Sequence, residues 1–415
     1  MTSPVKLNLW VMPNAGFDTR RVMRRELAIF QKENPGCRVE LTVHPWYFAW
    51  DRLMSVAKKL DSEDRPDVIQ IGSTWTTSLA ALGALAEITD FLNDVDRTDI
   101  IRPTWNYCYD AARTKAYSLP WFIDTRVLYY RNDILSHMGV KPEQLQSWKG
   151  FREACERLRD SKKLSKQYFA LALPGQREGV LIHDIAPWVW GAGGSFLNSN
   201  RREAQFHEDA ALNGMHFFFQ MIVDRLIPLL GRERVVPGNF FSGKFAFQIS
   251  GAWPANTVFN PKYPYYQPEV ARNYGISIFP AGPAGQVTFL GGSNLAIVNN
   301  SRHTEAAWKL ISFLTGVHSQ VRHSREIGMP PSRYTALEEL LASAPAEVAE
   351  GFRHSLRIAR TLPAAASLGT IERIIGRANQ ELIGAVRDGR YSESMLQATM
   401  TEAAREATYI LSLYE

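Results

Sequence analysis

Cysteine is scarce in this 415-residue sequence. It occurs three times, at Cys37, Cys108 and Cys155, and never as a C-x-x-C pair. An odd number of widely spaced cysteines predicts neither a disulfide framework nor a zinc site. We expect buried thiols, which behave as small apolar side chains, while a single disulfide stays open as the alternative.

Long apolar runs and a leader pattern are also missing. No stretch approaches the about 20 apolar residues that a membrane-spanning helix needs. Residues 1–4 (MTSP) run directly into a strand pattern, without a charged segment followed by an apolar one. Two interpretations follow: a cytoplasmic protein, or the mature part of a precursor whose signal peptide has been removed.

The sequence lacks the common catalytic motifs. The sequence contains no G-x-S-x-G, H-E-x-x-H or P-loop motif. The glycines at 191–194 (GAGG) follow a predicted helix rather than a strand, which is a poor context for a phosphate loop. The nine histidines show no metal-ligand spacing, so we expect neither a metal nor a cofactor. Composition does not exclude a glycosidase carboxylate pair, but no local spacing indicates one.

Charge of one sign does not dominate any segment. The net charge is +5, and the densest basic group, at Arg20, Arg21, Arg24 and Arg25, has acidic neighbours in the same helical segment. This pattern is typical of a solvated helix face. Without a zinc-finger spacing, an RNP motif or a basic tail, we expect no nucleic-acid partner.

What is present is a βα alternation in a chain too long for one core. Alternating apolar residues predict strands over 6–12 and 38–43, and a short apolar run predicts a strand over 68–71, with helices between them. Such a succession predicts a parallel sheet, and ligands bind outside the carboxyl ends of parallel strands. Further along, residues 291–294 (GGSN) precede an apolar run over 295–298.

Tryptophan is the most informative residue type. Six tryptophans lie at predicted element ends or beside Pro or Gly: Trp46, Trp75, Trp121, Trp188, Trp190 and Trp253. A flat indole covers the apolar face of a sugar ring, while polar groups bind its hydroxyl rim. Core packing is the alternative for each one singly, but we expect several to line a ligand cleft.

A series of short motifs carries a resemblance to a known family. The segments are 67–72 (DVIQIG), 82–90 (LGALAEITD), 117–132 (YSLPWFIDTRVLYYRN), 241–253 (FSGKFAFQISGAW), 275–280 (GISIFP), 291–292 (GG) and 307–315 (AWKLISFLT). In this order they resemble the extracellular solute-binding proteins of bacterial ABC importers, of the carbohydrate-binding type that includes the maltose-binding proteins. No single motif is specific, but the series covers nearly the whole chain.

The resemblance implies an α/β fold of two lobes, each a central, mostly parallel β-sheet flanked by helices, joined by a hinge with several crossings. It assigns residues 1–121 and 281–325 to an N-terminal lobe and 122–280 and 326–415 to a C-terminal lobe, with the ligand cleft between them. Hinges are expected near 121–125, 279–282 and 318–329.

The resemblance also implies a function. A monomeric periplasmic protein without a cofactor would capture a mono- or disaccharide, or a sugar conjugate, and deliver it to the transmembrane subunits of an ABC permease. Two alternatives stay open. A glycoside-processing hydrolase would need a second carboxylate beside Asp124, and a two-lobed sugar sensor would act without transport.

Site residues carried over from the family are Asn14, Trp46, Tyr47, Trp75, Trp121, Asp124, Trp188, Trp253, Gly292, Ser293, Asn294 and Arg333. Arg126 and Arg333 are also candidates for reading an anionic group, because a guanidinium binds carboxylate or phosphate well. One departure concerns residues 364–366 (AAA), which follow Pro363 where relatives often carry a stacking aromatic. The ligand is therefore expected to be smaller or more polar than a malto-oligosaccharide.

Overall fold

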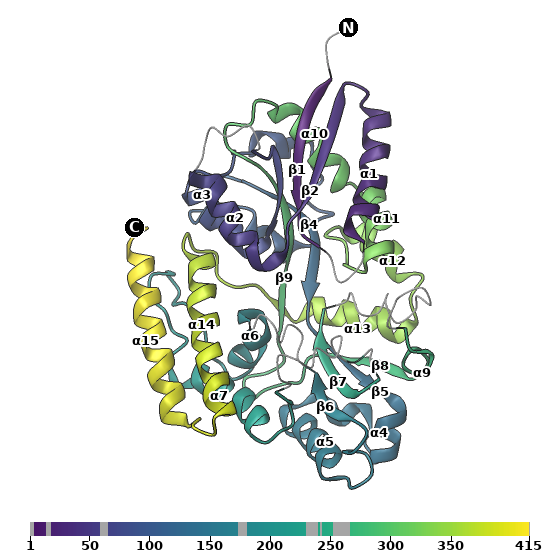
Figure 1. The fold of residues 1–415 in the computed structure, drawn as a ribbon, viewed down its shortest axis with the longest axis vertical. Coiled ribbons are helices and arrows are strands. Elements are labelled where there is room, and N and C mark those ends of the chain that lie inside the picture. The colour runs from purple at the N-terminus through teal and green to yellow at the C-terminus, as the bar shows by residue number, and fades with distance from the viewer. Residues whose placement is uncertain are drawn as a thin grey trace. The chain divides into compact units, whose positions relative to one another are not determined.

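Figure 1 shows the computed structural model, which describes residues 4–13, 18–58, 65–172, 181–229, 240, 243–251 and 266–414, with only the backbone of Tyr47 and 56–58. The chain forms two units. Unit 1 comprises Met1–Asp124, Leu290–Ser343 and Ala364–Gly369, and unit 2 comprises Thr125–Phe289, Ala344–Pro363 and Thr370–Glu415. Among the described residues, no helix combines the length and apolar character needed to cross a membrane.

The sheet of unit 1 follows the predicted βα succession. Its elements are β1 (Val5–Val11), α1 (Thr19–Glu33), β2 (Cys37–Val43), α2 (Trp46–Lys58), β3 (Val68–Gly72), η1 (Ser73–Trp75), α3 (Thr76–Ala81), η2 (Asp90–Asp94), η3 (Arg102–Tyr107), β4 (Leu119–Thr125), β9 (Thr288–Ile297), α10 (Thr304–Leu314), α11 (Val317–Ile327) and α12 (Tyr334–Leu341). The strand order is β2-β1-β3-β9-β10, with β4 also paired to β9; the short β10 (Ala359–Arg360) pairs with Thr288 and Phe289 at the start of β9.

Pairing within this sheet is mixed. Strand β1 pairs in parallel with β2, Val5 opposite Cys37, and with β3, Leu9 opposite Val68. Strand β9 runs antiparallel to β3. In the view of Figure 1, α1 and α11 lie on one side of these strands and α2 and α3 on the other. The alternating pattern of β1 arises because Leu7, Leu9 and Val11 all point into the core.

Unit 2 has a sheet of its own, in the order β6-β7-β5-β8. Its elements are β5 (Val127–Arg131), α4 (Asn132–Met138), η4 (Pro142–Gln146), α5 (Trp148–Asp160), β6 (Phe169–Ala172), α6 (Ile182–Gly191), α7 (Asp209–Val223), β7 (Phe245–Ser250), α9 (Pro268–Arg272), β8 (Tyr274–Ser277), α13 (Ala346–Arg357), β10 (Ala359–Arg360), α14 (Leu368–Arg387) and α15 (Glu393–Ser412). The expectation of a mostly parallel sheet is wrong here, since β5 runs antiparallel to both β7 and β8 and only β6 and β7 are parallel.

The unit boundaries differ from the predicted lobes. The segment 326–343 was predicted in the C-terminal lobe but lies in unit 1. Contacts around Arg333 tie this segment to unit 1: Arg333 pairs with Asp99 at 3.2 Å, and the Tyr334 amide donates to the Asp99 carbonyl at 2.6 Å. Residues 318–329, predicted as a hinge, lie mostly within α11, which is tied to α1 by Arg322 and its partner Glu26.

The predicted pivot at 279–282 is also wrong. Gly282 lies inside unit 2, where a Cβ at this position would stand 2.4 Å from the Gly191 carbonyl oxygen. Neighbouring backbone bonds hold the segment in place: the Ala281 amide donates to Gln146 at 2.8 Å, and the Trp148 amide donates to Ala281 at 3.0 Å. The chain instead leaves unit 1 within β4, after Asp124, and re-enters it within β9, before Leu290.

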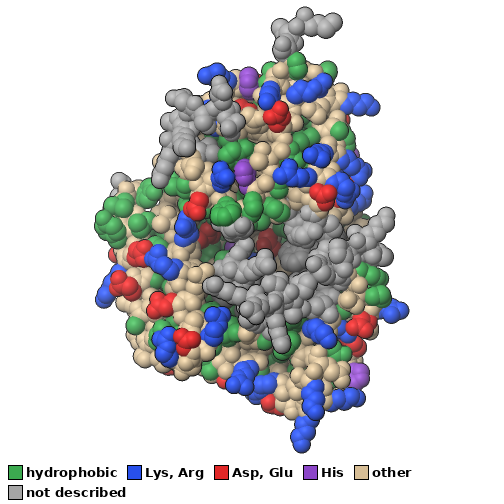
Figure 2. All heavy atoms as spheres, in the orientation of Figure 1, with side chains coloured by type: hydrophobic (Ala, Val, Ile, Leu, Met, Phe, Trp, Pro, Cys, Tyr) green, Lys and Arg blue, Asp and Glu red, His purple; other side chains and the backbone are tan. Residues whose placement is uncertain are grey.

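Charged side chains of both signs are mixed on the surface, and the three cysteines are buried. Figure 2 shows Lys and Arg side chains dispersed among Asp and Glu over the described part of this face. Cys37, Cys108 and Cys155 are buried free thiols, as expected. Burial raises the pKa of Cys108 and Cys155, which keeps both as unreactive thiols.

Candidate functional site

Three strands of unit 1 end at the same edge of its sheet. Because β1 is parallel to both β2 and β3, their carboxyl ends at Val11, Val43 and Gly72 lie on one side. The residues that follow β2 begin α2 at Trp46, and those that follow β3 include Trp75. The topology thus brings these two predicted site residues together, although they lie far apart in the sequence.

Three indoles meet there, and we call Trp46, Trp50 and Trp75 the tryptophan cluster. The Trp46 and Trp75 ring centroids are 5.9 Å apart at 67°, and those of Trp50 and Trp75 are 5.4 Å apart at 70°. Such edge-to-face contacts fix ring orientation. All three side chains are partly exposed, so the cluster presents aromatic surface at the sheet edge.

Specific contacts hold the cluster in place. The Trp46 indole N–H donates to the Pro13 carbonyl at 2.8 Å. Trp75 packs against a core group that includes Ile69 and Ile71, and a Cβ at Gly72 would approach its ring to 3.2 Å. The indoles are therefore positioned by the scaffold before any ligand arrives.

Two aromatic residues of this edge were missed by the sequence analysis. Trp50 follows Trp46 by four residues in α2, a helical spacing that places both on one face and could have identified it. Phe48 lies in the same helix with 51% of its surface exposed, an unusual exposure for phenylalanine.

A histidine lies beside the cluster. His44 follows β2 and packs edge-on against Trp10, with ring centroids 4.5 Å apart. Burial, together with the positive charges of Arg52 and Arg20, lowers the pKa of His44. The lowered pKa favours the neutral imidazole at pH 7.

The residues at 292–294 lie inside strand β9. Gly292, with φ of 141°, allows β9 to approach β4, since a Cβ there would lie 2.1 Å from the Phe122 carbonyl oxygen. The Ser293 hydroxyl accepts from the Gln70 amide at 3.0 Å. Asn294, 1% exposed, donates to the Ser118 hydroxyl at 2.9 Å and the Tyr107 carbonyl at 3.2 Å. The structure gives all three residues internal contacts within unit 1.

Trp121 and Trp188 are both buried in aromatic surroundings. Trp121 in β4 stacks on His323 at 4.7 Å and contacts Phe122 at 5.0 Å. Trp188 in α6 lies 4.8 Å from Phe279 and 5.4 Å from Trp148. These contacts are those of core packing, the alternative weighed for every tryptophan. Asp124, at the end of unit 1 in β4, is partly exposed.

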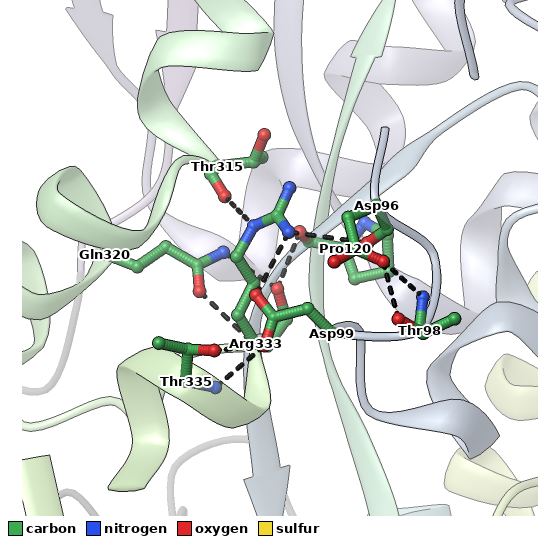
Figure 3. A network of polar contacts seen from close by, with 9 residues as sticks. Asp96, Thr98, Asp99, Pro120, Thr315, Gln320, Arg333 and Thr335 are labelled. Carbon is green, nitrogen blue, oxygen red and sulfur yellow. Dashed lines mark hydrogen bonds and ion pairs between the residues drawn. The ribbon is translucent and has the colours of Figure 1, made fainter. Parts of the chain in front are cut away.

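Arg126 and Arg333, the two candidates for binding an anionic group, are each paired with a carboxylate. Arg126 lies 3.7 Å from Asp184, both side chains being nearly buried. Figure 3 shows Arg333 bound to Asp99, with its Nε donating to the Thr315 carbonyl at 2.6 Å. Each guanidinium therefore has a partner within its own unit.

Asn14, the Tyr47 side chain and Trp253 lie outside the described residues. Within the described ones, no group of three or more His, Cys, Asp and Glu side chains is arranged to hold a metal ion.

Two α/β units, each on its own sheet, with an aromatic cluster at the carboxyl edge of parallel strands, define a two-domain binding protein. The chain belongs to the family described as bacterial extracellular solute-binding protein, whose profile matches residues 17–320. The family predicted from the sequence is thereby confirmed. As a member of it, the chain is a solute-binding protein and not an enzyme.

Solved structures show the same fold. The GacH receptor of Streptomyces glaucescens superposes with a TM-score of 0.82 at 20% identity, covering 98% of this chain and 99% of that chain. Maltose-bound MalE3 of T. maritima gives 0.80 at 20% identity, covering 98% and 100%. The two-lobed α/β binding-protein fold is confirmed by these similarities.

Curated relatives are similar at the sequence level. The diacetylchitobiose binding protein DasA of Streptomyces coelicolor is 24% identical over 360 residues, which are 83% of this chain and 77% of the relative. A maltooligosaccharide ABC transporter solute-binding lipoprotein of Streptococcus pneumoniae is 24% identical over 272 residues, 61% of this chain and 57% of the relative.

Proposed function

We propose that this protein is the substrate-binding component of an ABC importer in the periplasm, where it captures a mono- or disaccharide or a sugar conjugate and delivers it unchanged to the permease. The tryptophan cluster carries this proposal. Its indoles are partly exposed, fixed by neighbours, and located where parallel-strand folds bind ligands.

Sugar chemistry fits this surface. The C–H face of a pyranose packs on an indole, and stacking on a rigid ring requires little ordering when the ligand binds. The names of the two relatives above point to saccharides as well. A small ligand is supported by Ala364 and Ala365, which are buried and present no aromatic platform after Pro363.

Ligand identification is the direct test. Native mass spectrometry of protein purified from its host would reveal a bound ligand, and a panel of monosaccharides, disaccharides and sugar conjugates would be screened by thermal shift. A true ligand at 100 times its Kd raises the free energy of unfolding by about 2.7 kcal/mol. Every active compound should be recovered unchanged; cleavage would contradict a transport role.

Variants connect binding to the cluster. Phe48→Ala removes a 51% exposed aromatic from α2, the helix that carries Trp46 and Trp50, so we expect weaker sugar binding and an unchanged unfolding transition. Tyr409→Ala is the matched control, because Tyr409 is a 64% exposed aromatic on α15 of unit 2. Equal sugar affinity in both variants would remove Phe48 from the site.

A further inference from the structure

Unit 1 carries a surface pocket that shares no residue with the tryptophan cluster. Its volume is about 430 Å³, and it is lined by Arg97, Arg102, Trp105, Tyr109 and Tyr334, with Thr98 and the buried Ile100. This volume lies in the range that small-molecule sites occupy. All lining residues belong to the same unit, so the pocket is complete within it.

The polar network in Figure 3 holds the walls of this pocket together. The Asp99 carboxylate accepts from the Thr335 amide at 2.8 Å and from its hydroxyl at 2.7 Å, and it also pairs with Arg333. Ile100 pairs with Arg333 as an antiparallel bridge. These bonds join the segment 97–102 to the start of α12, which places Tyr334 against the arginine-bearing segment before any ligand binds.

The cations and rings of the pocket are available. Arg97 and Arg102 are exposed, and within the described part of the chain neither guanidinium has a hydrogen-bond or ion-pair partner. Of the nearby acids, Asp99 is engaged by Arg333 and Thr335, and Asp96 accepts from the amide and the hydroxyl of Thr98. The Trp105 and Tyr109 rings are 6.1 Å apart, and Tyr334 is 42% exposed.

We propose that this pocket binds a second kind of ligand: a small molecule with a carboxylate, sulfate or phosphate group on a flat apolar body. Guanidinium groups bind such anions through two parallel hydrogen bonds, and aromatic side chains cover the flat body. The site is separate from the proposed sugar site, so occupation of one does not require the other.

Isothermal titration with simple probes tests the proposal. Phenyl phosphate supplies both features, inorganic phosphate supplies the anion alone, and benzyl alcohol supplies the ring alone. Phenyl phosphate should bind about tenfold or more tightly than either of the other two, and its affinity should fall as salt rises.

Substitutions of the pocket residues test whether phenyl phosphate binds in this pocket. The double variant Arg97→Gln/Arg102→Gln should weaken phenyl phosphate binding about tenfold or more, since it removes both charge-assisted partners. The matched control is Arg24→Gln/Arg302→Gln, which changes the charge of unit 1 equally through two other exposed arginines. Tyr334→Ala should weaken the aromatic probe and leave the weak binding of inorganic phosphate unchanged. Trp46→Ala, at the proposed sugar site, should not alter phenyl phosphate binding.

Three results would overturn the proposal. One is the absence of phenyl phosphate binding at millimolar concentration. Another is equal affinity for inorganic phosphate and phenyl phosphate, which shows non-specific charge attraction. The third is an equal loss in the control double variant. Because Arg97, Arg102 and Tyr334 are exposed, the variants should keep the wild-type melting temperature, and a melting scan verifies this.

Discussion

Asn294 offers a sharp test of what the residues at 292–294 do. The resemblance to the family places Asn294 at the ligand, whereas the structure buries it in unit 1 as a donor. Its amide contacts the Ser118 hydroxyl at 2.9 Å, the Tyr107 carbonyl at 3.2 Å and the Thr76 hydroxyl at 3.3 Å. These partners come from β4, η3 and α3 or their adjoining residues, so one side chain joins several segments. Asn294→Ala removes this junction.

The contacts set the magnitude. Two amide protons are lost, and each buried hydrogen bond contributes about 0.5–1.5 kcal/mol net. The Ser118 and Thr76 hydroxyls are 3.0 Å apart and can still hydrogen-bond each other in the variant. The Tyr107 carbonyl is therefore the acceptor that loses its Asn294 donor. Leaving a buried acceptor unsatisfied costs about 1–3 kcal/mol. The lost bond to the hydroxyl pair and the unsatisfied carbonyl together give a destabilisation of about 1.5–4.5 kcal/mol, which corresponds to a fall in melting temperature of about 3–18 °C for a unit of this size.

Thermal and urea unfolding measure this loss, with Asn299→Ala as control. Asn299 also donates through its side chain, to the Gly83 carbonyl at 3.0 Å, but it lies at the surface. The control should therefore fall by no more than about 1 kcal/mol. An Asn294→Ala protein that unfolds like the wild type but loses its ligand would refute the structural role and restore the family's placement at the ligand.

Three further outcomes are expected. Trp46→Ala should weaken sugar binding by about 1–3 kcal/mol, measured by titration against Tyr409→Ala, and unchanged affinity would exclude the cluster. Burial lowers the pKa of His323 to about 3, so between pH 6.5 and 3 the unfolded state binds more protons than the folded state. The free energy of unfolding therefore decreases as the pH is lowered through this range, by up to about 1.4 kcal/mol per pH unit. His323→Phe should reduce this pH dependence in melting scans, and an unaltered dependence would contradict the assignment. Gly282→Ala should lower the melting temperature, because the added Cβ would clash with the Gly191 carbonyl oxygen. An unchanged melting temperature would mean that the backbone at this position shifts at little energetic cost.

Much of the fold was readable from local patterns. Alternating apolar residues located β1 and β2, because a strand with one buried face repeats every two residues, and a short apolar run located β3, which is buried along its whole length. The helix that follows β3 is short, because α3 ends at Ala81, just before Gly83, whose φ is 68°. Glycine in this left-handed conformation commonly ends a helix.

The sequence by itself determined the family, the two-unit α/β fold, and the presence of Trp46 and Trp75 after successive parallel strands. Those features rest on local order along the chain, which motifs and periodicity record. Only the tertiary structure decided which polar residues were available. Asn294 and Tyr107 are 187 positions apart, and Arg333 and Asp99 are 234 apart. No local pattern reports such partners, because a buried donor and a ligand-binding donor look alike in sequence until the chain folds. For the same reason, Arg97 and Arg102 became ligand candidates only when the structure showed that Arg333 is paired while these two have no partner among the described residues.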